Sequence, residues 1–300
     1  MVFLRKYLES CGCEPDLIAL IRLISRQMDA IRLAFLDNQM YEHTLNASGE
    51  LQAQMDTWAD EHLIKVVGES GLVRELASEE QADIIRFENS RCEYCMVMDP
   101  LDGSSLISTN LAVGTIVGIY ESGGVLQPGS KLRAAFYTLF GPLTVLVVSV
   151  GKGVQSFAWD PASEHYLLLK DHFSVPEGKQ YGTGGVRNEW LLPHKKVLDY
   201  FDQNNFKIRY SGSFVADCHQ LLVYGGIYTY PGSEKSPNGK LRLLFEANPL
   251  GYIITQAGGR ITDGKRNILD IVPEKHHQKT PVYVGSKGVI EKIEEIYRIS

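Results

Sequence analysis

Asp99-Pro100-Leu101-Asp102-Gly103-Ser104-Ser105 is the stretch of this 300-residue chain that most limits its fold and its chemistry. Proline fixes its own φ and disfavours helical geometry at the residue before it, so a bent turn is predicted, with both carboxylates facing one space. Two carboxylates at such a short distance repel each other unless a hard cation lies between them. The glycine lets the backbone approach a ligand, and the hydroxyls and N–H groups that follow can bind an anion. The stretch therefore predicts a metal site beside an oxyanion cradle, which suggests phosphate chemistry assisted by Mg²⁺ or Mn²⁺.

The composition is that of an ordinary globular protein, with 44% hydrophobic and 22% charged residues. Such a chain can form one large domain or two closely packed ones. The net charge of −6 argues against nucleic-acid binding, so an anionic substrate must meet local positive charge. No apolar run approaches the roughly 18 residues of a membrane span, and residues 1–16 lack the apolar stretch of a signal peptide. We therefore expect a cytoplasmic protein that contacts neither nucleic acid nor membrane.

The five cysteines do not form the pattern of a disulfide framework, because their number is odd and we expect no secretory leader. Cys92-Glu-Tyr-Cys95 has the spacing of a redox pair or of half a zinc site. Cys11 and Cys13 have the wrong spacing for the other half. Structural or inert thiols are the favoured interpretation, and a redox switch or metal site is the alternative.

Hydrophobic periodicity predicts an α/β fold with layered sheets and helices. Apolar residues at spacings of three and four predict a helix over 17–35, followed by a mobile loop over 40–50 and a helix over 50–67. Strands are predicted over 93–98, 113–120, 131–139, 143–150 and 154–158. Further helices are predicted over 193–201, 214–224, 240–257 and 287–297, with strands over 226–230 and 281–284. The polar segment 170–180 predicts a domain boundary, with domains over 1–175 and 176–300.

Four further acids could complete a site with the two aspartates of the turn. Glu79 and Glu80 are adjacent, so on a strand they would point to opposite faces, and one could hold metal while the other addresses another part of the pocket. Asp56 lies beside the apolar face of its helix, and Glu246 lies among apolar neighbours, where a buried carboxylate needs a partner. The positive and hydroxyl groups of 209–213 and 230–242 could bind a second phosphate. Taken singly, most of these groups are as compatible with a solvated surface.

Together, these segments closely resemble class I fructose-1,6-bisphosphatase, a member of the lithium-sensitive, metal-dependent sugar phosphatase superfamily. The resemblance runs from about Asn46 to the C-terminus. The motifs that carry it are Ser78-Glu-Glu80, Asp99-Pro-Leu-Asp-Gly-Ser-Ser105, Val113-Gly-Thr-Ile-Val-Gly-Ile-Tyr120 and Ser236-Pro-Asn-Gly-Lys-Leu-Arg-Leu-Leu-Phe-Glu-Ala-Asn-Pro249. It implies a layered αβαβα sandwich, a homotetramer, and hydrolysis of the 1-phosphate of fructose 1,6-bisphosphate by metal-activated water. Two or three divalent ions are implied for each site, either Mg²⁺ or Mn²⁺ in its place.

The resemblance also implies roles for individual residues. The implied metal ligands are Glu79, Asp99, the carbonyl of Leu101, Asp102 and Glu246. The implied catalytic residues, which activate the attacking water, are Glu80 and Asp56, with Glu50 standing where the family has an aspartate on its closing loop. The implied substrate contacts are Gly103, Ser104 and Ser105 with Arg242 at the 1-phosphate, Lys240, Ser213 and Phe214 at the sugar, and Asn188, Tyr210 and Tyr230 at the 6-phosphate. Arg209 resembles the arginine that reaches into the site of a neighbouring subunit.

Departures from the family pattern keep alternatives open. Leu106 stands where the family usually has asparagine, and Leu106-Ile-Ser-Thr-Asn110 is similar to the related sedoheptulose-1,7-bisphosphatases. A sedoheptulose bisphosphatase or a bifunctional enzyme is therefore the nearest alternative. An inactive sugar-phosphate-binding regulator is the alternative of another class. Such a protein should have lost a metal ligand or the base, whereas this chain has all five acids, at positions 79, 80, 99, 102 and 246.

The allosteric AMP site of the resembling family is not recognisable. Its AMP-inhibited members have a Lys-Tyr pair before Asp-Pro-Leu-Asp and an arginine after Gly-Ile-Tyr. Here Glu93-Tyr94 and Glu121 take those places, and acids where a phosphate needs cations reverse the local field. The sequence therefore predicts no AMP inhibition of the mammalian kind. The disulfide-bearing insertion of chloroplast forms is not evident either, so redox control is not expected.

Overall fold

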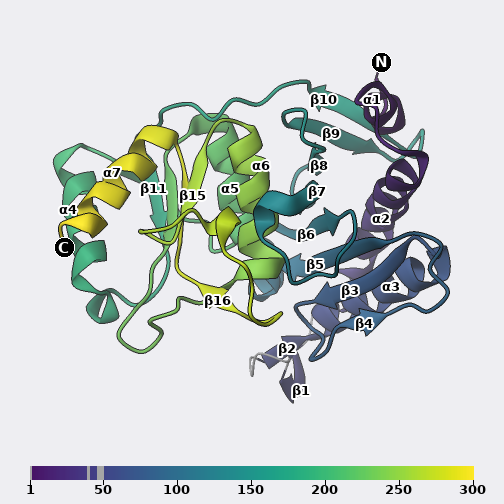
Figure 1. The fold of residues 1–300 in the computed structure, drawn as a ribbon, viewed down its shortest axis with the longest axis horizontal. Coiled ribbons are helices and arrows are strands. Elements are labelled where there is room, and N and C mark those ends of the chain that lie inside the picture. The colour runs from purple at the N-terminus through teal and green to yellow at the C-terminus, as the bar shows by residue number, and fades with distance from the viewer. Residues whose placement is uncertain (1, 39–40, 46–50) are drawn as a thin grey trace.

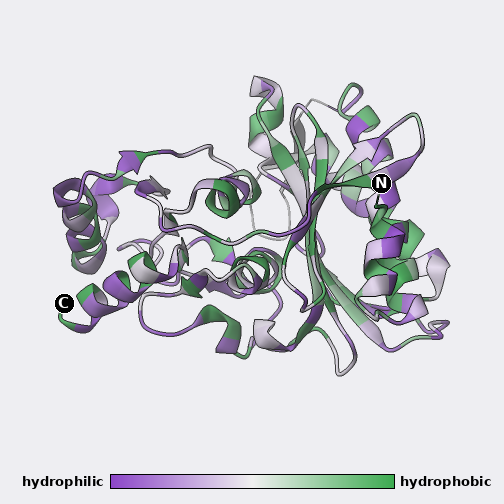
Figure 2. Cartoon of the chain, turned by 90° about the horizontal axis from the view of Figure 1, so that it is seen from above, coloured by the Kyte–Doolittle hydropathy of each residue, from purple (hydrophilic) through white to green (hydrophobic). Residues whose placement is uncertain are grey.

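Two sheets and three layers of helices alternate along the long axis of the molecule (Figures 1 and 2). The computed structural model describes residues 2–38, 41–45 and 51–300. The helices are α1 (Leu4–Ser10), α2 (Pro15–Ala34), α3 (Gln54–Ser70), α4 (Leu192–Gln203), α5 (Phe214–Tyr224), α6 (Asn248–Gln256) and α7 (Lys287–Arg298). Helices α1 to α3 cover one face of the larger sheet, α5 and α6 lie between the sheets, and α4 and α7 cover the outer face of the smaller sheet. This arrangement confirms the predicted layered αβαβα sandwich.

The larger sheet has eight strands in the order β10-β9-β8-β7-β6-β5-β3-β4. They are β3 (Val73–Ser78), β4 (Ile85–Arg86), β5 (Tyr94–Asp102), β6 (Val113–Tyr120), β7 (Leu132–Phe140), β8 (Thr144–Ser149), β9 (Gln155–Asp160) and β10 (His165–Lys170). All neighbours pair antiparallel except β3 and β5, which are parallel. The strands predicted from β5 to β9 are therefore confirmed to within a few residues.

The smaller sheet has five strands in the order β12-β11-β13-β17-β15. They are β11 (Gln180–Thr183), β12 (Lys207–Ile208), β13 (Ile227–Tyr230), β15 (Arg260–Thr262) and β17 (Val282–Gly285). Two further pairs lie outside both sheets: β1 (Tyr41–Leu45) with β2 (Leu51–Ala53), and β14 (Leu241–Arg242) with β16 (Lys279–Thr280).

The larger sheet is buried on both faces, and β8 shows why its sequence is almost continuously apolar. Successive side chains of a strand point to opposite faces. Accordingly, Leu146 and Val148 join the core beneath α2 and α3, while Val145 and Val147 join the core beneath α5 and α6. Each core is therefore formed partly by the same strand.

Two predicted elements are wrong in part. The loop expected over 40–50 contains β1, while residues 46–50 lie outside the described residues, and α3 begins at Gln54 rather than at residue 50. The helix expected over 240–257 is interrupted: β14 is followed by a π-helical turn over Leu243–Ala247 before α6 begins. Pro249 has no N–H to donate to the carbonyl four residues earlier, so an α-helix cannot run unbroken through this segment.

All five cysteines are free thiols, so no disulfide constrains the fold. In the part of the chain that the structure describes, no helix combines the length and the apolar character needed to cross a bilayer.

Candidate active site

Three buried carboxylates meet where the larger sheet faces the helices of the middle layer. Oxygen atoms of Asp99, Asp102 and Glu246 all lie within 4.8 Å of one another. The first two come from the end of β5, and the third comes from the π-helical turn before α6. The predicted convergence of distant acids is therefore present in the structure.

A bulge in β5 allows both of its aspartates to face one space. Residues three apart on a regular strand point to opposite faces, so Asp99 and Asp102 would diverge. The β5–β6 register shifts between them, because Asp99 is opposite Ile116 while Asp102 is opposite Gly114. One extra residue on the bulged strand restores a common side. The backbone N–H of Leu101 donates to Asp99 Oδ1 at 2.9 Å, which fixes the bend.

Asp102 is held by the first turn of α5. Its Oδ2 accepts hydrogen bonds from Ser213 Oγ at 2.7 Å and from the backbone N–H of Val215 at 2.9 Å. Ser213 also caps α5, because its Oγ accepts from the N–H of Ala216 at 3.3 Å. One hydroxyl thus caps the start of α5 and orients a predicted metal ligand.

Glycine is required at position 103 because the backbone there passes very close to Ser213. Its φ is +82°, and a Cβ at this position would lie 2.8 Å from Cβ of Ser213. A 3-10 helix over Ser104–Thr109 follows immediately. Because the first N–H groups of a helical segment have no partner within it, this start can bind an anion, as predicted.

Arg242 connects the remaining acids. Its backbone N–H donates to Glu246 Oε2 at 2.6 Å, and its Nη2 lies 3.3 Å from Glu79 Oε1. Glu79 and Glu80 do not lie on a strand, contrary to the prediction, because β3 ends at Ser78 and a turn follows. Both glutamates nevertheless face the same pocket.

The pocket has a volume of about 280 Å³, and most of the predicted site residues line it. Those that do are Asp56, Glu79, Glu80, Asp99, Leu101, Asp102, Gly103, Ser104, Ser105, Tyr210, Phe214, Tyr230, Lys240, Arg242 and Glu246. Ser213 is fully buried behind Asp102 instead. Asn188 and Arg209 are exposed side chains that do not line the pocket of this single chain, and Glu50 lies outside the described residues.

The pocket is strongly acidic at one end. Burial and mutual repulsion raise the pKa of Asp99 and of Glu246 well above the ordinary value for a carboxyl group. Burial raises the pKa of Asp102 to about 6, although the hydrogen bond from Ser213 opposes this. Six acidic residues line the pocket against Lys240 and Arg242. Hard oxygen ligands in this excess suit divalent cations such as Mg²⁺, so the residues present fit a metal site.

Three residues at or beside the pocket were not predicted from the sequence. Tyr228 lines the pocket and stacks on Phe214 with ring centroids 4.8 Å apart. It precedes Tyr230 by two positions on β13, so strand alternation could have identified it. Asp60 is buried and accepts hydrogen bonds from Ser78 and Gln81, and its position one helical turn after Asp56 was the available signal. His277 is the third, and its Nε2 lies 2.8 Å from the carbonyl oxygen of Gln81, directly after the two glutamates.

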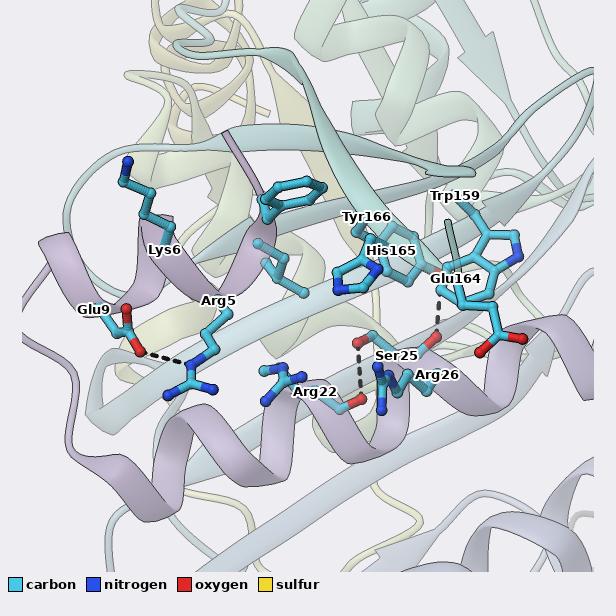
Figure 3. A pocket seen from close by; sticks show the side chains of 12 residues that line it. Arg5, Lys6, Glu9, Arg22, Ser25, Arg26, Trp159, Glu164, His165 and Tyr166 are labelled. Carbon is cyan, nitrogen blue, oxygen red and sulfur yellow. Dashed lines mark hydrogen bonds and ion pairs between the residues drawn. The ribbon is translucent and has the colours of Figure 1, made fainter. Parts of the chain in front are cut away.

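A second pocket of about 370 Å³ lies between α1, α2 and the β9–β10 hairpin (Figure 3). Its lining has the opposite character, since Arg5, Lys6, Arg22 and Arg26 outnumber Glu9 and Glu164. Arg5 and Glu9 form an ion pair of 2.7 Å, which leaves a net positive lining. Divalent cations are repelled there, so the metal chemistry belongs to the acidic pocket.

Comparisons with known proteins agree with this geometry. The family model for the fructose-1,6-bisphosphatase N-terminal domain matches residues 16–171, and that for the C-terminal domain matches residues 175–298. A class 1 fructose-1,6-bisphosphatase of Methanospirillum hungatei is 95% identical over 298 residues, covering 99% of this chain and 96% of the relative. One from Methanocorpusculum labreanum is 54% identical, covering 99% of this chain and 92% of the relative.

Solved structures include a comparable fold. The crystal structure of Leishmania major fructose-1,6-bisphosphatase in holo form has a TM-score of 0.94 and 30% sequence identity, covering 100% of this chain and 99% of that chain. The shared fold, the two family models and the relatives lead to one conclusion: this chain belongs to the class 1 fructose-1,6-bisphosphatase family.

Proposed function

We propose that this protein hydrolyses fructose 1,6-bisphosphate to fructose 6-phosphate and phosphate by removing the 1-phosphate. The observation that carries the proposal is the pocket in which Asp99, Asp102 and Glu246 meet beside Ser104 and Ser105. Membership of the family and the names of its relatives support the choice of substrate.

Divalent cations are proposed to bind to Glu79, Asp99, the carbonyl of Leu101, Asp102 and Glu246. The excess of buried carboxylates supports a hard cation, for which we propose Mg²⁺, with Mn²⁺ as a substitute and two or three ions per site. When bound, such ions neutralise charge on the phosphoryl oxygens and lower the pKa of water.

The chain's own residues are proposed to position the phosphate and move a proton. Backbone N–H groups of Ser104 and Ser105 bind the phosphoryl oxygens, and Arg242 adds positive charge. Glu80 and Asp56 accept the proton of the attacking water, with assistance from Glu50. The two serines act as donors rather than nucleophiles, because no general base for them is evident.

The other end of the pocket is proposed to hold the sugar and the 6-phosphate. Lys240 and Phe214 are assigned to the sugar, and Tyr210 and Tyr230 to the phosphate, because all four line the pocket. Ser213 supports this end from behind Asp102, and the contact of Asn188 with the 6-phosphate stays a prediction of the sequence. The exposed position of Arg209 supports a role across a subunit boundary in a homotetramer. That assembly, the cytoplasmic location and the domain boundary at 175/176 stay predictions of the sequence.

Phosphate release with Glu80→Gln tests the assignment. The variant keeps the shape of the side chain but cannot accept a proton, so kcat should fall by about a hundredfold or more while substrate binding persists. Glu295→Gln, on the exposed outer helix α7, is the matched control and should retain full activity. Unchanged turnover in Glu80→Gln would reject Glu80 as the base, and an inactive wild type that binds substrate would instead indicate a regulator.

Sedoheptulose 1,7-bisphosphate is the second candidate substrate, favoured by Leu106 and Asn110. The side chain of Leu106 lies beside Gly212 at the edge of the pocket, because a Cβ added to Gly212 would be 3.4 Å from the methyl groups of Leu106. Comparing kcat/KM for the two bisphosphates decides between them. We expect the fructose substrate to be preferred, and a higher ratio for the sedoheptulose substrate would reverse the proposal.

A further inference from the structure

The turn that carries Glu79 and Glu80, which we call the glutamate turn, is held from two sides. On one side, Asp60 of α3 accepts hydrogen bonds from Ser78 Oγ at 2.5 Å and from the side-chain amide of Gln81. The backbone N–H of Glu79 also donates to the carbonyl of Met98 in β5, at 3.1 Å. All of these contacts come from the N-terminal half of the chain.

On the other side, a segment almost 200 residues later in sequence reaches the same turn. Nε2 of His277 lies 2.8 Å from the carbonyl oxygen of Gln81, and Nε2 of His276 lies 2.6 Å from that of Ala82. Two adjacent imidazoles therefore bind two consecutive carbonyls. We call residues 273–280 the histidine arm.

The histidine arm is itself attached to the strand that carries Arg242. β16 at its end pairs with β14, so that Arg242 is opposite Lys279. The backbone N–H of Leu243 donates to the carbonyl of Gln278 at 2.7 Å. The ring of His277 packs edge-on against Phe245 at 5.3 Å, directly before Glu246. The arm thus joins the segment of Arg242 and Glu246 to the segment of Glu79 and Glu80.

The proton positions follow from the partners. A carbonyl oxygen can only accept, so Nε2 of each histidine carries hydrogen. Nδ1 of His277 is buried and has no hydrogen-bond partner among the described residues. A buried acceptor without a hydrogen-bond partner destabilises the folded state. A leucine at this position would avoid that cost, so packing alone does not account for histidine.

We propose that His276 and His277 are positioning residues that hold the glutamate turn against Arg242 and Glu246, and thereby set the affinity of the site for divalent cations. This inference rests on the proposed function for its metal, but not for the contact itself. Groups that orient metal ligands typically change metal affinity by about 10–100-fold when removed.

The experiment compares His277→Leu, which lacks the donor, with His277→Gln, whose amide can donate from nearly the place of Nε2. Mn²⁺ binding is measured calorimetrically without substrate. We expect about tenfold weaker binding in His277→Leu and a change within about twofold in His277→Gln. The Mg²⁺ concentration for half-maximal activity should rise by the same factors.

His194→Leu is the matched control. His194 is fully buried and bonded to Thr183 and Tyr283 in the C-terminal core, away from the pocket. It should lower Tm while Mn²⁺ affinity remains that of the wild type. His277→Leu should instead weaken Mn²⁺ binding without lowering Tm, because the substitution also removes the unpaired Nδ1.

Hydrogen exchange of residues 79–83 in metal-free protein tests the contact without the metal. Faster exchange is expected in His277→Leu and not in His277→Gln or His194→Leu. Wild-type exchange and Mn²⁺ affinity in His277→Leu would overturn the inference. A wild type that binds no Mn²⁺ and releases no phosphate would reject the proposed function, while the exchange result would still decide the contact.

Discussion

At the scale of single residues, Gly103 shows how little space separates the phosphate cradle from α5. A Cβ there would approach Ser213 to 2.8 Å, and Ser213 is the hydroxyl that orients Asp102. A side chain at position 103 would therefore occupy the space of the Ser213 side chain, so only glycine fits there.

Gly103→Ala should consequently impair activity beyond its effect on stability. We expect a Tm decrease corresponding to about 1–2 kcal/mol, from the positive φ and the clash. Displacement of the cradle should reduce kcat/KM by about a hundredfold. Gly258→Ala is the control, because its φ is +84° but a Cβ there meets nothing within 4 Å. Equal activity losses in both variants would show that the clash with Ser213 is irrelevant.

The residues that sequence reasoning could and could not find differ in what defines them. Asp99 and Asp102 are identifiable because proline and glycine fix the local backbone around them. Helical spacing places Asp60 on the same face of α3 as Asp56, but no local pattern shows that Asp60 or His277 will meet the glutamate turn. Their contacts are set by how α3 and the histidine arm pack around the glutamate turn.

At the scale of elements, the first turn of α5 combines a structural and a functional task. Ser213→Ala removes the cap, which should cost about 1 kcal/mol, and also the donor to Asp102. Half-maximal activation should then require about tenfold more Mg²⁺. Ser286→Ala is a matched buried control, since the described contacts of the Ser286 hydroxyl are with backbone groups of Pro176, Gly178 and Gly226. A similar Mg²⁺ requirement in both variants would contradict this role.

The ends of β5 and β6 carry the prediction about AMP. Glu93 precedes β5 and forms a 2.6 Å ion pair with Arg74, while Glu121 is exposed after β6. Both acids repel a nucleotide phosphate, so activity should be unchanged across an AMP titration at fixed Mg²⁺. Potent, saturable inhibition would show that AMP binds despite them.

Hydrophobic periodicity predicts some of the helices and strands correctly and fails for others. Strands β5 to β9, β13 and β17 and helix α5 were predictable from their apolar patterns, whereas β3, β4, β10, β11, β12 and β15 were not predicted. The segment 240–257 was predicted as one helix, since its apolar residues fit helical spacing. Pairing of β14 with β16 and the proline at 249 instead divide it, and the resulting π-helical turn is what brings Glu246 to the N–H of Arg242.

At the scale of the whole molecule, the buried acids make stability depend on pH and metal together. Unfolded Asp102 ionises near 3.8, whereas burial raises its pKa in the folded protein to about 6. Without metal, the stabilising effect of its proton is complete below about pH 4 and is lost as pH rises through about 6, an effect of about 3 kcal/mol. A divalent cation bound to the ionised carboxylates would restore the stability that is lost with the proton.

The increase in Tm on adding Mg²⁺ to chelator-treated protein should therefore be larger at about pH 8 than at about pH 5. Thermal unfolding in EDTA and in Mg²⁺ at both pH values measures it. Equal increases would indicate that the ion binds away from these carboxylates.

The site draws its acids from positions 56 to 246, and the histidine arm follows at 273–280. A chain emerging from the ribosome therefore exposes Asp99 and Asp102 long before Glu246 and the imidazoles exist to complete their surroundings. The full set of acids and imidazoles can therefore come together only after residue 277 has been made, and we expect an unfinished polypeptide to lack the assembled site.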